Sequence, residues 1–286
     1  METVLNSKLR CPHCQNPLLD KGNVLVCKGC GASFEVNDGK VFFLPKSQVD
    51  APDQERAVLR RDSKRWTPLR KKQYAFLSNV LEAEATSVEM LDIGCGPAQF
   101  DTLTTRFKQV TGIDFSPFTP VHVVHDINAS LPFSDSSYDV ALATNVLEHI
   151  PDSTRLLAET IRTLRPGGRL YGVIPFLLEV HQPPYDFHRY TPYMLRLLME
   201  KAGFIDIAIF PTNNILETFV HQQNHYFKYM YGHMSPIMPL HKKVVIKLLV
   251  QFFKVLVSLL PKDAYVSDRY TLGYNFSAKK PEQRPS

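Results

Sequence analysis

Short apolar runs alternate with helix-forming segments from about residue 86 onward. Such runs occupy residues 88–93, 109–114, 121–126, 138–145 and 167–176. Between them lie segments with apolar residues at helical spacing, such as DSTRLLAETIRTLR. Strands that recur with helices between them form a parallel, doubly wound sheet. The pattern therefore predicts an α/β, Rossmann-like fold whose ligand binds at the carboxyl ends of the strands.

Two later apolar runs, residues 203–214 and 268–280, predict the sixth and seventh strands of the same sheet. Upstream, LRKKQYAFLSNVLEAE carries Tyr74, Leu77 and Leu81 at helical spacing and predicts a helix that leads into the domain. Residues 46–65 are polar and charged, which indicates a linker with a short helix. The residues between the last two strands form a long insertion.

The insertion contains a helix with a narrow polar stripe on an otherwise apolar surface. Between Thr218 and Lys262 the sequence has six lysines and no acidic residue. Two lysines at mid-span would cost about 2.5–3.5 kcal/mol each in a bilayer, which argues against a transmembrane helix. One interpretation is a helix packed on the domain or on a second subunit of a homodimer. The alternative is a peripheral membrane contact through residues 242–260.

Four of the five cysteines form two pairs with C-x2-C spacing. Cys11 and Cys14 form the first pair, Cys27 and Cys30 form the second, and twelve residues separate the pairs. Two such knuckles can complete a tetrahedral site of four thiolates, which leaves no open position for chemistry. The alternatives are two disulfides or four unrelated thiols. We predict a structural zinc ion held by all four cysteines.

Composition adds weaker constraints. The net charge of +5 permits an anionic partner without requiring one, and 44% hydrophobic residues can bury a full core. The amino terminus, METVLNSKLRCPHC, has no apolar stretch before its first cysteines, so we expect no secretory signal. A cytoplasmic protein, with or without peripheral membrane contact, is the resulting expectation.

A glycine-rich turn follows the first strand of the predicted sheet. In VEMLDIGCGPAQF, Gly94 and Gly96 allow the backbone to approach a ligand closely. A dinucleotide fingerprint would need glycine at position 99, where the chain has Gln99. Asp114 ends the next strand about twenty residues later, where a carboxylate can accept hydrogen bonds from both ribose hydroxyls. A nucleotide-type cofactor is therefore expected at this edge.

Five motifs occur in a specific order and carry a family resemblance. They are LDIGCG, VTGID, LPFSDSSYDVALATNVLEHIPD, LRPGG and EKAGF. Together they resemble class I S-adenosylmethionine-dependent methyltransferases of the type 11 group, over about residues 86–212. The cysteine segment is similar to small methyltransferase-activator proteins. The resemblance implies a methyl-transfer enzyme that uses S-adenosylmethionine.

The resemblance also implies roles for residues at matching positions. Asp92, Gly94 and Gly96 would cradle the methionine end of the cofactor, and Asp114 would hold the ribose. The remaining positions concern the adenine and the sulfur: Asp126 and Ile127 would face the adenine, and Asn145 would lie under the sulfur. Two positions depart from the family pattern. Ala98 replaces a glycine, and FSPFTP is too short for the usual helix, which makes Phe115 and Phe118 candidates to cover the adenine.

The segment HQPPYDFHRYTP, residues 181–192, follows the fifth strand and precedes a helix for which Thr191 is a suitable N-cap. A loop at this position lies over the cofactor's methyl group. We expect Asp186 and Arg189 to brace it, while His181, Tyr185 and His188 face the acceptor. After the fourth strand, Glu148 and His149 either cap the next helix or belong to the site.

These inferences divide the chain into four parts: a zinc ribbon (1–47), a linker with leading helices (48–85), a methyltransferase domain (86–212 plus 268–280) and a helical insertion (213–267). We expect methyl transfer to oxygen of a small-molecule, lipid-linked or glycan acceptor, with a histidine as general base. An RNA base methyltransferase is a second hypothesis, which would make nucleic acid the partner. A catalytically inactive binding module is a third.

Overall fold

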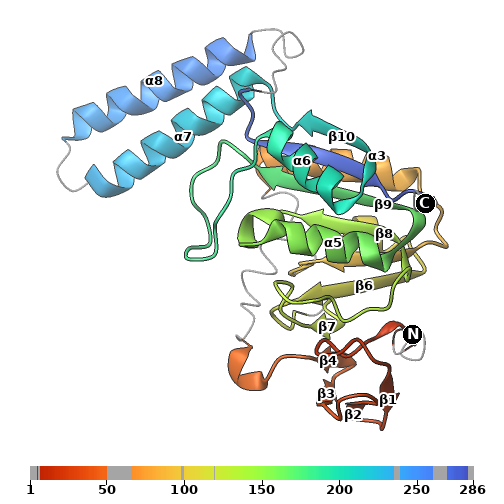
Figure 1. The fold of residues 1–286 in the computed structure, drawn as a ribbon. Helices are drawn as coiled ribbons and strands as arrows, with labels where there is room; N and C mark the ends of the chain where they lie inside the picture. The colour runs from red at the N-terminus through yellow and green to blue at the C-terminus, as the bar shows by residue number, and fades with distance from the viewer. Residues whose placement is uncertain are drawn as a thin grey trace.

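A computed structural model describes residues 5, 7–49, 66–97, 100–118, 120–234, 239–259 and 269–282 (Figure 1). Most of the predicted linker therefore lies outside the described residues, as do Ala98 and Gln99. Of the linker, the structure shows a 3-10 turn, η1 (Lys46–Gln48).

The core of the molecule is a seven-stranded sheet in the order β7-β6-β5-β8-β9-β11-β10. Its strands are β5 (Glu89–Ile93), β6 (Gln109–Asp114), β7 (Val123–Val124), β8 (Tyr138–Thr144), β9 (Leu164–Pro175), β10 (Ile205–Pro211) and β11 (Gly273–Lys279). Neighbours among β5 to β9 pair in parallel, whereas β11 runs antiparallel to both β9 and β10. The predicted doubly wound, mostly parallel sheet is confirmed.

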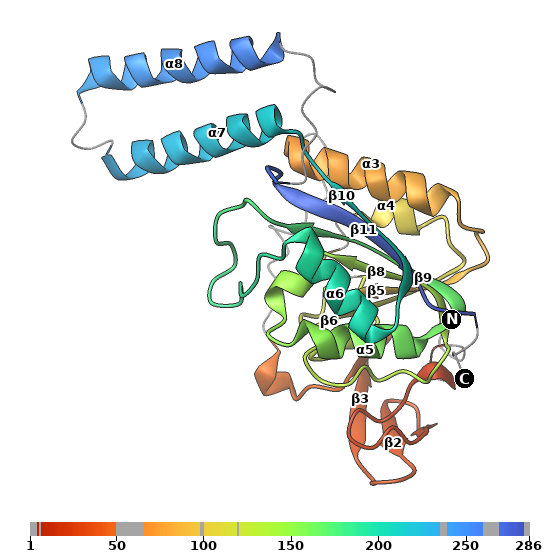
Figure 2. The same ribbon diagram turned by 45° about the horizontal axis from the view of Figure 1, so that its top comes forward.

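Helices cover both faces of this sheet, because successive residues of a buried strand point to opposite sides. On one face, Met90 packs with α3 (Pro68–Glu82) and α4 (Asp101–Thr104). On the other, Leu91 packs with α5 (Ser153–Thr163) and α6 (Pro192–Ala202). Figure 2 shows the two helix layers on either side of the strands.

N-cap residues fix the first residues of the two helices beside the site. Thr191 caps α6 by accepting a hydrogen bond from the Met194 backbone N–H at 3.2 Å, as predicted. Asp152 caps α5 by accepting from the Arg155 N–H at 3.3 Å. Neither Glu148 nor His149 is the capping residue of α5, so capping does not explain the pair and its role in the site stays a prediction.

The cysteine segment folds as a small antiparallel sheet that extends the main one. It comprises β1 (Leu18–Asp20), β2 (Val24–Cys27), β3 (Ser33–Asn37) and β4 (Lys40–Phe42). β4 pairs in parallel with β7, so the two sheets form one continuous eleven-stranded sheet. The Arg10 N–H also donates to the Pro132 carbonyl at 2.9 Å. Sequence periodicity does not predict this junction.

The insertion contains two helices, α7 (Ile215–Met234) and α8 (Leu240–Ser258). They lie side by side and project together from the sheet as a hairpin (Figures 1 and 2). α8 therefore packs along α7 rather than on the sheet. Within the described residues, no helix combines the length and apolar character needed to cross a membrane.

Candidate functional site

The glycine turn lies at the carboxyl end of β5, at the centre of the parallel strands. Gly94 has φ +62°, and a Cβ there would lie 2.7 Å from a methyl group of Val146. Gly96 has φ +52° and open space where a Cβ would be. Its backbone N–H donates to Asp114 Oδ2 at 2.8 Å, which ties the turn to the end of β6. Backbone with positive φ and no side chain leaves room for a close-lying ligand.

Two carboxylates face each other across this turn. Asp92 is enclosed by the protein, and its Oδ1 has no hydrogen-bond partner among the described groups. Burial, together with the charge of Asp114, raises the pKa of Asp92 to about 7. Burial also raises the pKa of Asp114, against the opposing effect of backbone N–H groups that include those of Ser116 and Gly96. A cation beside Asp92 would supply the missing partner, as the amino group of S-adenosylmethionine could.

A cavity opens beside Asp92. The residues that line it come from α3, the glycine turn, the start of α4 and β8: Leu77, Leu81, Asp92, Cys95, Phe100, Leu103, Thr104, Leu142 and Thr144. Cys95 is buried, and burial raises its pKa well above the ordinary value, which indicates a packing residue rather than a nucleophile. The cavity is small and mainly apolar, so the orphaned carboxylate oxygen is the feature that fits the amino group at the methionine end of the expected cofactor.

The predicted adenine-side residues lie around the ends of β6 and β7. Phe115 is exposed, whereas Phe118 packs against the buried cluster of Cys95, Val121 and Val124. Asp126 accepts hydrogen bonds from both the backbone and the side chain of Asn128. Ile127 is partly buried against the main core. Phe115 is thus better placed than Phe118 to cover a bound ring.

Asn145 directly follows β8 and has φ +54°, so the backbone is no longer extended at this residue. Its Oδ1 accepts a hydrogen bond from Gln73 Nε2 at 3.3 Å. Gln73 lies in α3 between Leu69 and Leu77, on the buried face of that helix. Sequence reasoning missed Gln73, although a polar residue on the apolar face of a helix is the signal that would have found it.

The loop after β9 is braced as predicted. Arg189 donates to Asp186 through Nη1 at 2.6 Å and Nη2 at 2.7 Å. The Arg189 side chain also donates to the carbonyls of Leu178, Glu179 and His188. The hydrogen bonds from Arg189 hold the pKa of Asp186 well below its usual range. The bonds to Leu178 and Glu179 tie the start of the loop to its end, and the bidentate pair holds Asp186 against Arg189.

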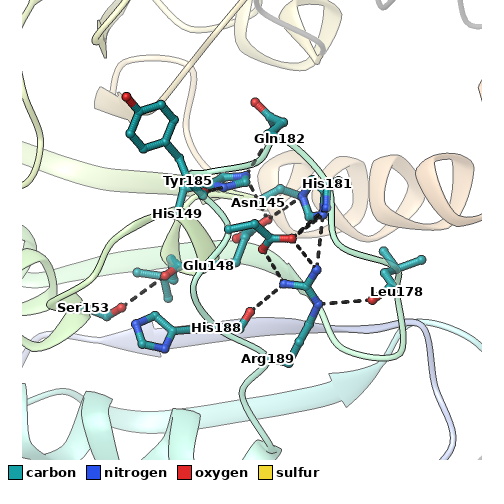
Figure 3. Close-up of polar contacts among 12 residues, drawn as sticks. Asn145, Glu148, His149, Ser153, Leu178, His181, Gln182, Tyr185, His188 and Arg189 are labelled. Atoms are coloured by element: carbon teal, nitrogen blue, oxygen red, sulfur yellow. Dashed lines mark hydrogen bonds and ion pairs between the residues drawn. The ribbon is translucent and has the colours of Figure 1, made fainter.

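A carboxylate and two histidines meet beneath the loop (Figure 3). Glu148 Oε1 lies 3.7 Å from His149 Nε2 and 3.7 Å from His181 Nε2. The Glu148 side chain is 0% exposed, and neither of its oxygens has a hydrogen-bond partner among the described residues. Contact with Glu148 raises the pKa of His181, against the opposing effect of burial. The structure thus brings together His149 and His181, which are 32 residues apart in sequence.

Tyr185 and His188 do not join this group. Figure 3 shows the phenol ring of Tyr185 turned away from Glu148, and the side chain is 67% exposed. His188 donates through Nε2 to the Pro151 carbonyl at 3.1 Å and packs against the ring of Tyr190. Of the predicted acceptor-facing residues, His181 is the one whose side chain lies beside the side chains of His149 and Glu148.

The four ribbon cysteines converge on one point. Their sulfur atoms all lie within 4.8 Å of one another, with Cys11 to Cys30 at 3.6 Å and Cys14 to Cys27 at 3.4 Å. Zinc–sulfur bonds of about 2.3 Å in a tetrahedron place sulfurs about 3.8 Å apart, so the arrangement fits a zinc ion. The backbone N–H groups of Gly29 and Cys30 donate to Cys27 Sγ. A hydrogen bond from the Asn16 side chain lowers the pKa of Cys14 to about 6.

Comparison with known proteins identifies two family segments. Residues 91–172 match the family described as a methyltransferase domain, and residues 8–39 match the family described as Trm112p-like protein. An uncharacterized methyltransferase of Mycobacterium sp. (strain KMS) is 39% identical over 90 residues, covering 28% of this chain and 35% of the relative. A "probable S-adenosylmethionine-dependent methyltransferase" of Mycolicibacterium smegmatis is 33% identical over 132 residues, covering 41% and 51%. The chain therefore spans a third to about half of the length of these curated relatives.

Solved structures show weaker overall likeness. A SAM-dependent methyltransferase of Archaeoglobus fulgidus superposes with a TM-score of 0.46 at 18% identity, covering 74% of this chain and 94% of that one. A complex that contains the Haloferax volcanii Trm112 methyltransferase activator gives a TM-score of 0.46 at 16% identity, covering 79% and 97%. The resemblance predicted from the motifs is confirmed by the family matches: the chain carries a Trm112p-like amino-terminal segment followed by a methyltransferase domain.

Proposed function

We propose that the protein is an S-adenosylmethionine-dependent methyltransferase that transfers the methyl group to an oxygen of a small-molecule, lipid-linked or glycan acceptor. The observation that carries this proposal is the pair of partly buried carboxylates at the glycine turn, one of which has an enclosed oxygen without a partner among the described groups. That arrangement suits a ligand with a cationic amino group at one end and ribose hydroxyls at the other. The match of residues 91–172 to a methyltransferase domain supports the same assignment.

The cofactor would lie along the carboxyl ends of β5 and β6. Asp92, with Gly94 and Gly96, would hold its methionine end, and Asp114 would accept hydrogen bonds from the ribose. Asp126, Ile127 and Phe115 would border the adenine, while Asn145 would lie under the sulfur. When bound, the cofactor supplies an activated methyl group on a sulfonium, so the protein has to align the acceptor and exclude water.

The acceptor would bind between the cofactor and the loop of residues 181–190. The bidentate Asp186–Arg189 pair gives this loop a fixed shape, which suits a wall of the acceptor site. His149 and His181 lie under the loop with their side chains partly exposed, and so can contact a bound hydroxyl. His188 remains a predicted acceptor-facing residue, although its ring nitrogen is occupied by the Pro151 carbonyl.

Calorimetry with S-adenosylmethionine tests the proposal directly. Asp114→Ala removes a charged hydrogen-bond acceptor and should weaken binding by about 1.5–3 kcal/mol. Asp135→Ala, an exposed aspartate paired with Arg162, is the matched control and should leave the affinity unchanged. Absence of binding by the unaltered protein would instead favour the inactive binding module, and an equal loss in both variants would remove the ribose role.

The ribbon and the hairpin complete the proposal. The cysteine cluster would hold one structural zinc ion, since its four thiolates fit the metal and leave no open position. The hairpin would rest on a lipid surface, because α8 exposes large apolar side chains in a segment whose charged residues are all lysines. A lipid-linked acceptor would then be presented close to the sheet. The RNA alternative rests on the ribbon alone, and a net charge of +5 gives it little support.

A further inference from the structure

The group of Glu148, His149 and His181 contains a buried carboxyl group that makes no direct side-chain hydrogen bond within the described residues. Glu148 is enclosed on all sides, yet both carboxylate oxygens lack a hydrogen-bond donor among the described residues. Buried carboxylates normally accept several hydrogen bonds or bind a cation, because desolvation strongly disfavours an isolated charge. The two histidine nitrogens that contact Glu148 Oε1 lie 3.7 Å from it, which is beyond hydrogen-bond distance.

The distances suit an ion placed between these three side chains. One carboxylate oxygen and one nitrogen from each imidazole lie within 4.8 Å of one another. Metal–nitrogen and metal–oxygen bonds of about 2.0–2.2 Å require ligand atoms about 3–4 Å apart. The 3.7 Å separations fall in that range. The three side chains could therefore become ligands without a change in the backbone.

Both imidazoles are held with one nitrogen toward Glu148 and the other on a neighbouring group. His149 Nδ1 donates to the Tyr185 carbonyl, so Nε2, which lies 3.7 Å from Glu148 Oε1, is an acceptor and takes a hydrogen bond from Gln182 Nε2 at 3.3 Å. His181 Nδ1 lies 3.4 Å from Asp186 Oδ2 and 3.4 Å from Arg189 Nη2. His149, which donates its second nitrogen to a carbonyl, has the usual arrangement of a metal-binding histidine, whereas His181 Nδ1 accepts a hydrogen bond from Arg189 Nη2 and would have to release it to donate to Asp186.

We propose that Glu148, His149 and His181 bind a divalent transition-metal ion that takes an acceptor hydroxyl together with a neighbouring oxygen of the same acceptor. The donor set of two imidazoles and one carboxylate favours zinc, iron, cobalt or manganese over magnesium, which prefers oxygen ligands. The His149 and His181 side chains are 19% and 32% exposed, so an ion held by them keeps positions open toward solvent.

This proposal rests on the methyltransferase function and specifies its acceptor as one with adjacent oxygens, such as a vicinal diol. An ion at this position lowers the pKa of the bound hydroxyl, whose proton leaves to solvent. The oxygen then forms a bond to the methyl carbon as the carbon–sulfur bond breaks, and the sulfonium becomes a neutral thioether. One proton is released for each methyl group transferred, and no oxidant or reductant is required.

A second group of Glu179, His221 and His225 has similar composition and serves as a control. Glu179 is exposed and already forms an ion pair with His225 at 2.8 Å. Its charge is compensated by solvent and by that contact, so the physical reason for an ion is absent there. Variants in this second group should not affect metal binding under the loop.

Titration of the metal-free full-length protein with Co2+ distinguishes the ribbon from the proposed site. Cobalt bound to thiolates gives strong near-ultraviolet charge-transfer absorption, whereas cobalt bound to imidazole and carboxylate gives only visible bands. We expect one equivalent of each kind. Glu148→Gln should remove the second class with at least a 100-fold loss of affinity and leave the thiolate class unchanged. Asp186→Asn should weaken the second class by about 10–100-fold.

His149→Asn provides a second route if Glu148→Gln fails to fold, and His225→Asn is the matched control that should retain both classes. Cobalt bound only to thiolates in the unaltered protein, or equal loss in Glu148→Gln and His225→Asn, would overturn the proposal. S-adenosylmethionine binding, measured on the same samples, should be unaffected by Glu148→Gln. Normal cofactor binding by the unaltered protein, without a second class of bound cobalt, would thus refute the metal site and leave the methyltransferase function standing.

Discussion

The zinc ribbon and the helical hairpin are both appended to the seven-stranded sheet, but they are attached in opposite ways. The ribbon continues the sheet through the β4–β7 pairing and contributes Leu9, Phe34 and Val41 to the main buried cluster. The hairpin projects from the sheet (Figure 2). Large apolar side chains along α8 are exposed. The ribbon is thus part of the same folding unit as the sheet, whereas the hairpin presents an exposed apolar surface.

The contacts at the base of the hairpin sharpen this contrast. α7 begins beside the sheet, where Glu217 pairs with Lys72 of α3 and accepts the backbone N–H of Asn214. Thr218 bonds to the carbonyls of Asn214 and Tyr270. Polar contacts of this kind fix direction but bury little apolar area, so they add less stability than a shared core. Disruption of the ribbon should therefore cost far more stability than changes on α8.

Loss of the ribbon metal should have the largest effect. Structural zinc contributes about 10–16 kcal/mol of apparent binding free energy in small zinc-binding peptides, which is comparable to the stability of a whole domain. Cys27→Ser should therefore lose zinc, measured by elemental analysis, and lower the melting temperature of the entire protein. His13→Asn, a change inside the same knuckle at an exposed residue, should retain one zinc ion. Full zinc retention by Cys27→Ser would contradict the four-thiolate site.

Truncation of a core residue at the junction should have the next largest effect. Leu9 is 0% exposed, and its backbone forms an isolated antiparallel β-bridge with Phe133 of the methyltransferase domain. Leu9→Ala should lower the free energy of unfolding by about 2–5 kcal/mol, because it leaves a cavity shared by ribbon and sheet. Leu248→Ala on α8, where the side chain is 64% exposed, should change it by less than about 0.5 kcal/mol. Urea denaturation measures both, and similar losses would mean that the hairpin is as integrated as the ribbon.

An ion pair across the same junction should have a smaller, pH-dependent effect. Lys8 Nζ lies 2.7 Å from Glu89 Oε1, and Arg165 contacts the other oxygen. Burial raises the pKa of Glu89, but the hydrogen bonds from Lys8 and Arg165 outweigh it and hold the pKa below its ordinary value. Because the folded pKa is depressed, the stabilisation is present above the unfolded pKa of about 4.3 and is lost as pH falls through the folded value.

Lys8→Met keeps the length of the side chain and removes its charge. It should lower the free energy of unfolding by about 1 kcal/mol at pH 7. This estimate lies between the contribution of an exposed ion pair and that of a hydrogen bond to a charged group. Denaturation at several pH values should show this difference shrinking below about pH 4. A difference that stays constant down to pH 3 would mean that Lys8 acts through packing instead.

Sequence periodicity predicted the sheet because its information is local. The run 88–93 became β5 and the run 109–114 became β6, since buried parallel strands are continuous apolar segments. The N-cap at Thr191 and the Asp186–Arg189 brace were also predictable, because both partners lie within a few residues. Motif resemblance then named candidates for the cofactor site.

Contacts between distant segments could not be predicted in this way. The short strands β4 and β7 carry no signal for each other, so the continuous sheet was missed. His181 was expected to face an acceptor together with Tyr185 and His188, yet its contacts are to Glu148 and Asp186. Which of several polar residues in a loop point inward depends on the turn geometry, and that is set by tertiary contacts rather than by sequence spacing.

The exposed face of α8 gives the smallest expected effect on stability and the sharpest test of what the hairpin does. Leu248→Glu and Phe252→Glu each place a charge on an exposed apolar position and should change the free energy of unfolding by no more than about 0.5 kcal/mol. If the face rests on lipid, each should weaken binding to anionic vesicles, because burying one such side chain is worth about 1.5–3 kcal/mol.

Gln251→Glu adds the same charge at an exposed position of the polar stripe and is the matched control. It should retain most of the binding, losing only about 1 kcal/mol of electrostatic attraction. Co-sedimentation with the vesicles at low salt measures all three variants. Equal losses in all three would show attraction by charge alone, and no co-sedimentation of the unaltered protein would leave α8 as a surface for a second subunit.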